Sequence, residues 1–120
     1  MEKETDASQL DQAEKTKRRW ERFKVEIRVK VTATRSGKEI ITSGTAHDVS
    51  EGGMALFLAG DLIVGEAVSI DFAMPYSQRR VMRGVIRNRD RYEYGIQFVD
   101  PTPEDREDIV RNCRALALLR

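Results

Sequence analysis

Strict two-residue alternation begins at Phe23, and it restricts the fold more than any other feature of the chain. The apolar positions of the pattern are Phe23, Val25, Ile27, Val29, Val31 and Ala33, and charged or polar residues stand between them. Successive side chains of a strand point to opposite faces of a sheet. The segment is therefore predicted to be a strand with one buried and one solvated face.

Shorter segments of the same kind follow, separated by turn residues. Strands are predicted at about 38–48, 54–58, 67–74, 79–90 and 92–99. Ser36-Gly37 and Glu51-Gly52-Gly53 mark turns, Pro75 ends a strand, and Gly44 is expected to form a bulge or bend. Some six short strands at fairly regular spacing, without internal repeats, predict a small antiparallel β-barrel.

The end of the chain is predicted to be a helix over residues 103–119. Thr102 is a suitable N-cap, Pro103 suits the first helical position, and the acids near Glu104 are expected to lie on a solvated face. Ile109, Cys113, Leu116 and Leu119 recur at helical spacing, which gives a stripe able to cover the barrel. Leu116, Leu118 and Leu119 are expected to pack on the barrel, with a contact or oligomer surface as the alternative. The fold class is therefore all-β with a C-terminal α-helix.

Residues 1–16 contain one large apolar residue after Met1, which is too little to bury a face, so a disordered or loosely helical tail is expected there. A basic arm at 17–23 and a barrel at 23–99 follow. No apolar run approaches the roughly 18 residues of a membrane span, and no secretory signal is present, which predicts a cytoplasmic protein. The single cysteine, Cys113, excludes an intramolecular disulfide and a Cys-rich zinc site.

The charges are unevenly distributed, although the net charge is only +1. Basic residues gather within 15–22 and again within 79–91, and acidic residues gather within 100–108. Local positive patches on a nearly neutral protein favour a small anionic ligand over long nucleic acid. A single-stranded nucleic-acid barrel would also need aromatic stacking platforms, and the few aromatic residues show no cluster.

The sequence offers little support for catalysis. His47, Asp48 and Ser50 are the residue types of a catalytic triad, but adjacent strand residues are expected to point to opposite faces, so His47 and Asp48 should diverge. No metal-ligand cluster, phosphate-binding loop or nucleophile elbow is present. The prediction is a protein that is not an enzyme and that uses neither a metal nor a cofactor.

Two segments nevertheless carry groups suited to a guanine nucleotide. The first is Lys17-Arg18-Arg19-Trp20-Glu21-Arg22-Phe23, and the second is Asp48-Val49-Ser50-Glu51-Gly52-Gly53. Arginine matches phosphate oxygens or the O6/N7 edge of guanine, and aspartate accepts from the N1 and N2 donors. Each segment also has a purely structural interpretation, namely a solvated arm and an ordinary turn. The residue chemistry alone therefore leaves the ligand open.

In order, separation and surrounding strands, the two segments resemble the PilZ domain family. That family carries an RxxxR arm, often RRxxRF, before its first strand and a DxSxxG turn after its second. Here Arg18-Arg19-Trp20-Glu21-Arg22-Phe23 and the 48–53 turn match these motifs, and Tyr94-Gly95-Ile96-Gln97-Phe98 is similar to the family's last strand. The resemblance covers about residues 17–115, and the motif positions show no departure.

The resemblance implies a six-stranded barrel that binds the bacterial second messenger cyclic di-GMP on its outer surface. The ligand-binding residues that it implies are Arg18, Arg19, Arg22, Asp48, Ser50, Gly52 and Gly53, with Lys17, Trp20, Arg83 and Arg87 as auxiliary positions. The arginines would hold phosphates and guanine edges, Asp48 and Ser50 would bond guanine, and the arm would fold over the ligand. Lys17 would favour two bound ligands. A downstream protein partner is expected, and the alternative function is a protein-interaction adaptor that does not bind the nucleotide.

Overall fold

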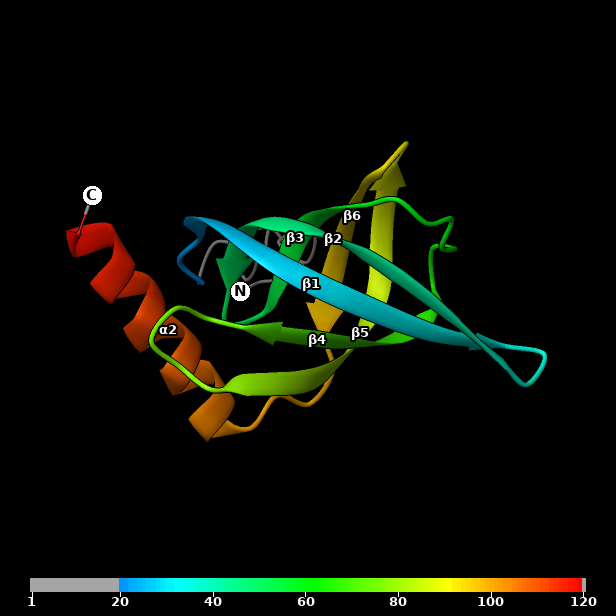
Figure 1. Cartoon of the computed structure of the whole chain (residues 1–120). Helices are drawn as coiled ribbons and strands as arrows, with labels where there is room; N and C mark the ends of the chain where they lie inside the picture. The colour runs from blue at the N-terminus through cyan, green and yellow to red at the C-terminus, as the bar shows by residue number, and fades with distance from the viewer. Residues whose placement is uncertain (1–19, 120) are drawn as a thin grey trace, which may run out of the picture.

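The computed structural model describes residues 20–119, which form six strands and one helix (Figure 1). The elements are β1 (Phe23–Arg35), β2 (Lys38–Ser50), β3 (Gly53–Leu58), β4 (Ala67–Ala73), β5 (Arg79–Asp90), β6 (Glu93–Phe98) and α2 (Pro103–Leu118). All neighbouring strands are antiparallel, and they close into a barrel in the order β1-β2-β3-β6-β5-β4. The predicted small antiparallel barrel with a C-terminal helix is confirmed.

The barrel interior is filled by one face of each strand. In β1, every second residue from Phe23 to Ala33 is buried, as the alternation predicts. Tyr94 of β6 is also fully buried, and its hydroxyl donates to the carbonyl of Gly60 and accepts from the amide of Leu62. The phenol therefore satisfies two backbone groups of the β3–β4 connection inside an otherwise apolar core.

The predicted irregularity of β2 lies at His47 and not at Gly44. Pairing with β3 passes from Ala46–Leu56 to Asp48–Ala55, so His47 is an extra residue in β2. Ala46 and Val49 are both buried, and therefore His47 and Asp48 lie together on the outer side of the barrel. The prediction that these two side chains diverge was wrong, because a bulge interrupts the alternation that it assumed. Gly44 remains in register, and a β-carbon there would collide with the carbonyl oxygen of Phe57.

The first turn of α2 anchors the helix to the β4–β5 side of the barrel. Thr102 and Asp105 form a capping box, with the Thr102 hydroxyl accepting from the Asp105 amide at 3.0 Å. Arg80 of β5 donates to Asp105 and to Asp108. Burial alone would raise the pKa of Asp108, but its bonds with Ser77, Arg80 and Arg111 lower the pKa below its ordinary value. The prediction of a purely solvated acidic face was therefore wrong for Asp105 and Asp108.

The apolar stripe of α2 covers the core over only part of its length. Ile109 and Cys113 are buried, and Leu116 packs partly against the core. Leu118 and Leu119 are 86% and 69% exposed, because the end of α2 extends past the strands (Figure 1). The expectation that these two leucines pack on the barrel was wrong. α2, the helix of the described residues, is neither long nor apolar enough to cross a lipid bilayer.

Candidate functional site

The turn between β2 and β3 holds the acidic and glycine-bearing motif in a defined shape. The Ser50 hydroxyl accepts from the Gly52 amide at 3.1 Å and contacts the Gly53 carbonyl at 3.5 Å. The Gly52 carbonyl in turn accepts from the Phe98 amide of β6 at 2.9 Å. Gly53 is required by packing, since a β-carbon there would collide with the carbonyl oxygen of Ile96. The turn is thus fixed by its own hydrogen bonds and by β6.

The described end of the basic arm lies against this turn. Nη1 of Arg22 is 3.9 Å from Oδ2 of Asp48, at the point where the start of β1 runs beside the end of β2. Glu21 bonds Arg114 of α2 at 3.2 Å, so the arm also contacts the helix. Lys17, Arg18 and Arg19, the other predicted arm residues, lie outside the described residues. Of the arm arginines, the structure brings Arg22 to the acidic turn.

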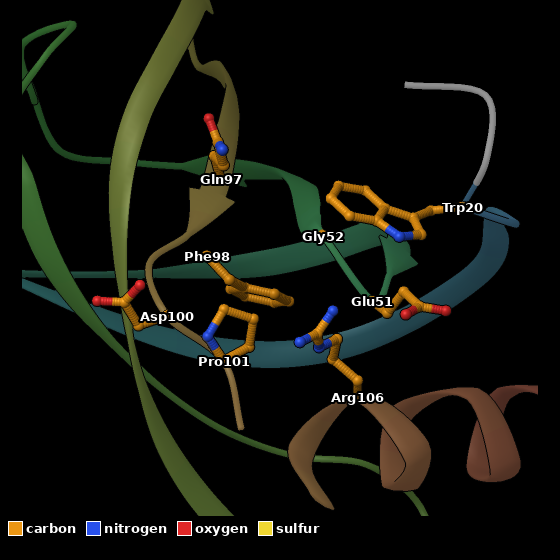
Figure 2. A pocket seen from close by; sticks show the side chains of 8 residues that line it. All are labelled: Trp20, Glu51, Gly52, Gln97, Phe98, Asp100, Pro101 and Arg106. Carbon is orange, nitrogen blue, oxygen red and sulfur yellow. The ribbon is translucent and has the colours of Figure 1, made fainter. Parts of the chain in front are cut away.

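Trp20 lies directly on the glycine turn and forms one wall of a pocket. A β-carbon on Gly52 would collide with the six-membered ring of the Trp20 indole, so only glycine permits this contact. The pocket has a volume of about 400 Å³, within the range of about 300–1,000 Å³ that is typical of small-molecule sites. Its lining residues are Trp20, Glu51, Gly52, Gln97, Phe98, Asp100, Pro101 and Arg106 (Figure 2).

The two predicted auxiliary arginines of β5 lie beside this pocket and outside its lining. Nη2 of Arg83 is 3.7 Å from Oδ2 of Asp100, and Nε of Arg87 donates to Oε1 of Gln97. Both partners line the pocket. Arg83 and Arg87 therefore orient groups at its rim, while Trp20, the third described auxiliary residue, is part of the wall.

Several lining residues were missed by sequence reasoning. Phe98 ends the last strand, Asp100 and Pro101 follow it, and Arg106 lies in the first turn of α2. The local sequence pattern does not mark these positions. They lie near the glycine turn because β6 pairs with β3, which is a contact between segments distant in the sequence. Glu51 lies within the predicted turn motif but was interpreted only as a turn residue.

His47 and Ser50 are engaged in separate contacts. The His47 Nε2 atom is 3.0 Å from Oε2 of Glu93, and its ring lies 4.7 Å from that of Phe57. The Ser50 hydroxyl bonds only within its own turn among residues 20–119. Among the same residues, no group of three or more His, Cys, Asp or Glu side chains is placed to hold a metal ion. The site thus brings cations, acceptors and an aromatic wall together around a glycine turn.

Comparison with known proteins identifies a family over most of the chain. The PilZ domain model matches residues 16–115. No curated protein matches the chain. Several solved structures share the fold at low sequence identity.

The PilZ domain of CeSA from a cellulose-synthesizing bacterium has 20% identity and a TM-score of 0.61, with 81% of this chain and 98% of that chain covered. The inhibitor of motility MotI/DgrA from Bacillus subtilis has 19% identity and a TM-score of 0.65 over 84% of this chain and 51% of that one. This chain thus spans about half the length of the Bacillus protein. The PilZ domain of YcgR from Escherichia coli, solved with c-di-GMP, has 13% identity and a TM-score of 0.65, covering 82% and 90%.

Proposed function

Because the chain belongs to the PilZ domain family, we propose that it is a non-catalytic receptor for cyclic di-GMP. The observation that carries the proposal is the meeting of Arg22, from the RxxxR arm, with Asp48, from the DxSxxG turn. These side chains supply a phosphate- and guanine-binding donor and an acceptor for guanine N1–H and N2–H₂. The PilZ domain of YcgR, which shares the barrel, was solved with c-di-GMP, and this supports the choice of ligand.

In this proposal each motif residue has a distinct role. Arg18 and Arg22 bind phosphates and guanine edges, with Arg19 assisting. Asp48 and Ser50 bond a guanine base. Gly52 and Gly53 let the turn backbone lie close to the ligand, and Lys17 adds positive charge that favours a second ligand.

The arm is proposed to close over the dinucleotide. Among residues 20–119, the Arg22 side chain is 74% exposed and its ion pair with Asp48 is 3.9 Å long, so it is able to move toward a bound anion. Trp20 covers Gly52, and a ligand that approaches the turn backbone has to displace the indole or stack on it. Because Trp20 is the single tryptophan of the chain, its fluorescence reports this step directly.

The signal is proposed to pass to a downstream protein partner in the cytoplasm. The outer side of α2 carries a hollow of about 590 Å³ that includes Val110, Ala115 and Leu118. Glu51 and Arg106 line both this hollow and the pocket beside Trp20. A conformational change at the glycine turn would therefore move residues that also form the surface of α2. The same surface favours the second candidate function, an adaptor that binds a protein and no nucleotide.

Calorimetric titration with cyclic di-GMP tests the proposal, with GTP and cyclic di-AMP as controls. We expect saturable binding of cyclic di-GMP, weaker binding of both controls and a change in Trp20 fluorescence. The Arg18→Ala/Arg22→Ala double variant should lose most of the binding. Arg28→Ala removes an exposed arginine from the outer face of β1 and should bind like the parent. Absence of binding by the parent chain would leave the adaptor function in its place.

A further inference from the structure

Arg106 of α2 lines the pocket beside the glycine turn. Its Nε atom is buried and has no hydrogen-bond partner among the described residues. Its side chain extends from the helix toward Phe98, Trp20 and Glu51 (Figure 2). A buried donor without a partner costs about 1–3 kcal/mol of stability. A ligand that accepts a hydrogen bond from this donor would remove that cost.

The pocket is better suited to a base than to a phosphate. Trp20 presents a flat apolar surface, while Phe98, which is buried, and Pro101 beside it complete the apolar part of the lining (Figure 2). Glu51 and Asp100 also line the pocket, and the carboxylate of Asp100 is largely exposed and paired with Arg83. The Glu51 carboxylate at this pocket would repel a phosphate, whereas a neutral base with both donors and acceptors meets no such repulsion.

Guanine is the base whose polar edges match these groups. Its O6 and N7 atoms accept the paired donors of an arginine, and its N1–H and N2–H₂ groups donate to a carboxylate. Adenine presents a donor at the position of O6, and it would face the donors of Arg106 unfavourably. The Trp20 indole allows the base to stack while its edges form hydrogen bonds.

We propose that this pocket receives a guanine base of the dinucleotide and that Arg106 binds its O6/N7 edge. Glu51 accepts from the opposite edge, and Trp20 contacts the face of the ring. The inference rests on the proposed function, and it adds a contact from the C-terminal helix to a site otherwise built from the arm and the turn. Ligand binding thereby links the barrel to α2.

The test compares Arg106→Met with Arg111→Met by titration against cyclic di-GMP and cyclic di-AMP. Methionine keeps the apolar stem of Arg106, so packing and folding are retained while the donors are removed. Arg111→Met makes the same change of residue and charge on the same helix, at an exposed position paired with Asp108. Arg106→Lys restores the charge without the planar fork of donors. Thermal unfolding of each variant verifies that the barrel is intact.

We expect Arg106→Met to weaken cyclic di-GMP binding about tenfold or more and to reduce the preference over cyclic di-AMP, because one bidentate base contact is lost. Arg106→Lys should be intermediate, and Arg111→Met should stay within about twofold of the parent. If the parent binds and Arg106→Met matches it in affinity and preference, this inference is wrong and the proposed receptor function stands. The inference is also wrong if Arg111→Met weakens cyclic di-GMP binding as much as Arg106→Met does. The loss would then come from removing a positive charge from α2 and not from losing a base contact. A parent chain that does not bind cyclic di-GMP overturns both.

Discussion

Arg22 and Asp48 face each other at 3.9 Å with very different freedom: the arginine side chain is 74% exposed and the aspartate side chain 13%. The aspartate is held by the bulged end of β2, and the arginine extends from the chain just before β1. At this separation, and with one exposed partner, the pair contributes little to the stability of the fold. A ligand that offers phosphate to Arg22 and donors to Asp48 therefore replaces a weak contact by several stronger ones.

Arg22→Ala should weaken cyclic di-GMP binding about ten- to a hundred-fold, because hydrogen bonds to charged groups are lost. The melting temperature should change little, since the Arg22–Asp48 contact is long and exposed. Calorimetric titration measures the affinity, with Arg28→Ala on the outer face of β1 as the matched control. If Arg22→Ala binds cyclic di-GMP with the affinity of the parent, Arg22 does not contact the ligand.

Asp48→Ala should lower the preference for guanine more than it lowers general attraction for phosphate. The substitution removes an acceptor for guanine and also removes the negative charge beside Arg22, so phosphate binding retains its cation. The ratio of the affinities for cyclic di-GMP and cyclic di-AMP is the quantity to measure. Asp90→Ala, an exposed carboxylate at the end of β5, serves as the control. An unchanged ratio would show that Asp48 does not read the base.

Gly52→Ala and Gly53→Ala should behave differently although the two residues are adjacent. The methyl group at Gly52 meets the movable indole of Trp20, whereas the methyl group at Gly53 meets the backbone oxygen of Ile96. Gly52→Ala should therefore shift Trp20 fluorescence with a stability change within about 1 kcal/mol. Gly53→Ala should cost about 1–3 kcal/mol, because β3 and β6 have to separate. Urea unfolding together with fluorescence spectra distinguishes these outcomes, and equal stability of the two variants would contradict them.

Glu66→Gln should make the protein less stable at neutral pH and less sensitive to acid. Arg35 donates to both carboxylate oxygens of Glu66, at 2.7 and 2.9 Å, and these bonds lower the pKa of the carboxyl although its burial acts in the other direction. A lowered pKa in the folded state gives stability that is present above the unfolded value of about 4.3 and is lost as pH falls through the folded value. The melting temperature of Glu66→Gln should thus lie a few degrees below that of the parent at pH 7 and converge with it below about pH 4.

Thermal unfolding between pH 7 and pH 3 makes this comparison. Glu39→Gln, which changes an exposed carboxylate at the start of β2, should follow the parent throughout. A constant difference between Glu66→Gln and the parent across this range would mean that Glu66 does not titrate with a lowered pKa.

The amino-acid sequence alone determined the elements of the fold and the order of its motifs. Period-two alternation depends on local backbone geometry, so β1 was predicted from Phe23 onward, and the Ser36-Gly37 turn and the Thr102 cap were recognisable for the same reason. The barrel class followed from six such strands. The residue chemistry of Arg22, Asp48 and Ser50 left the ligand open, and these residues were predicted as a site from the resemblance of their two segments to the PilZ motifs.

Only the tertiary structure decided where these residues meet and what completes the pocket. The bulge at His47 places Asp48 on the outer surface, and it arises from pairing between β2 and β3. Phe98 and Arg106 line the same pocket as Trp20 because β6 pairs with β3 and α2 packs against β1 and β2, which are contacts between segments remote in sequence. The free energy of such contacts depends on how the whole chain packs, and no local pattern of residues records it.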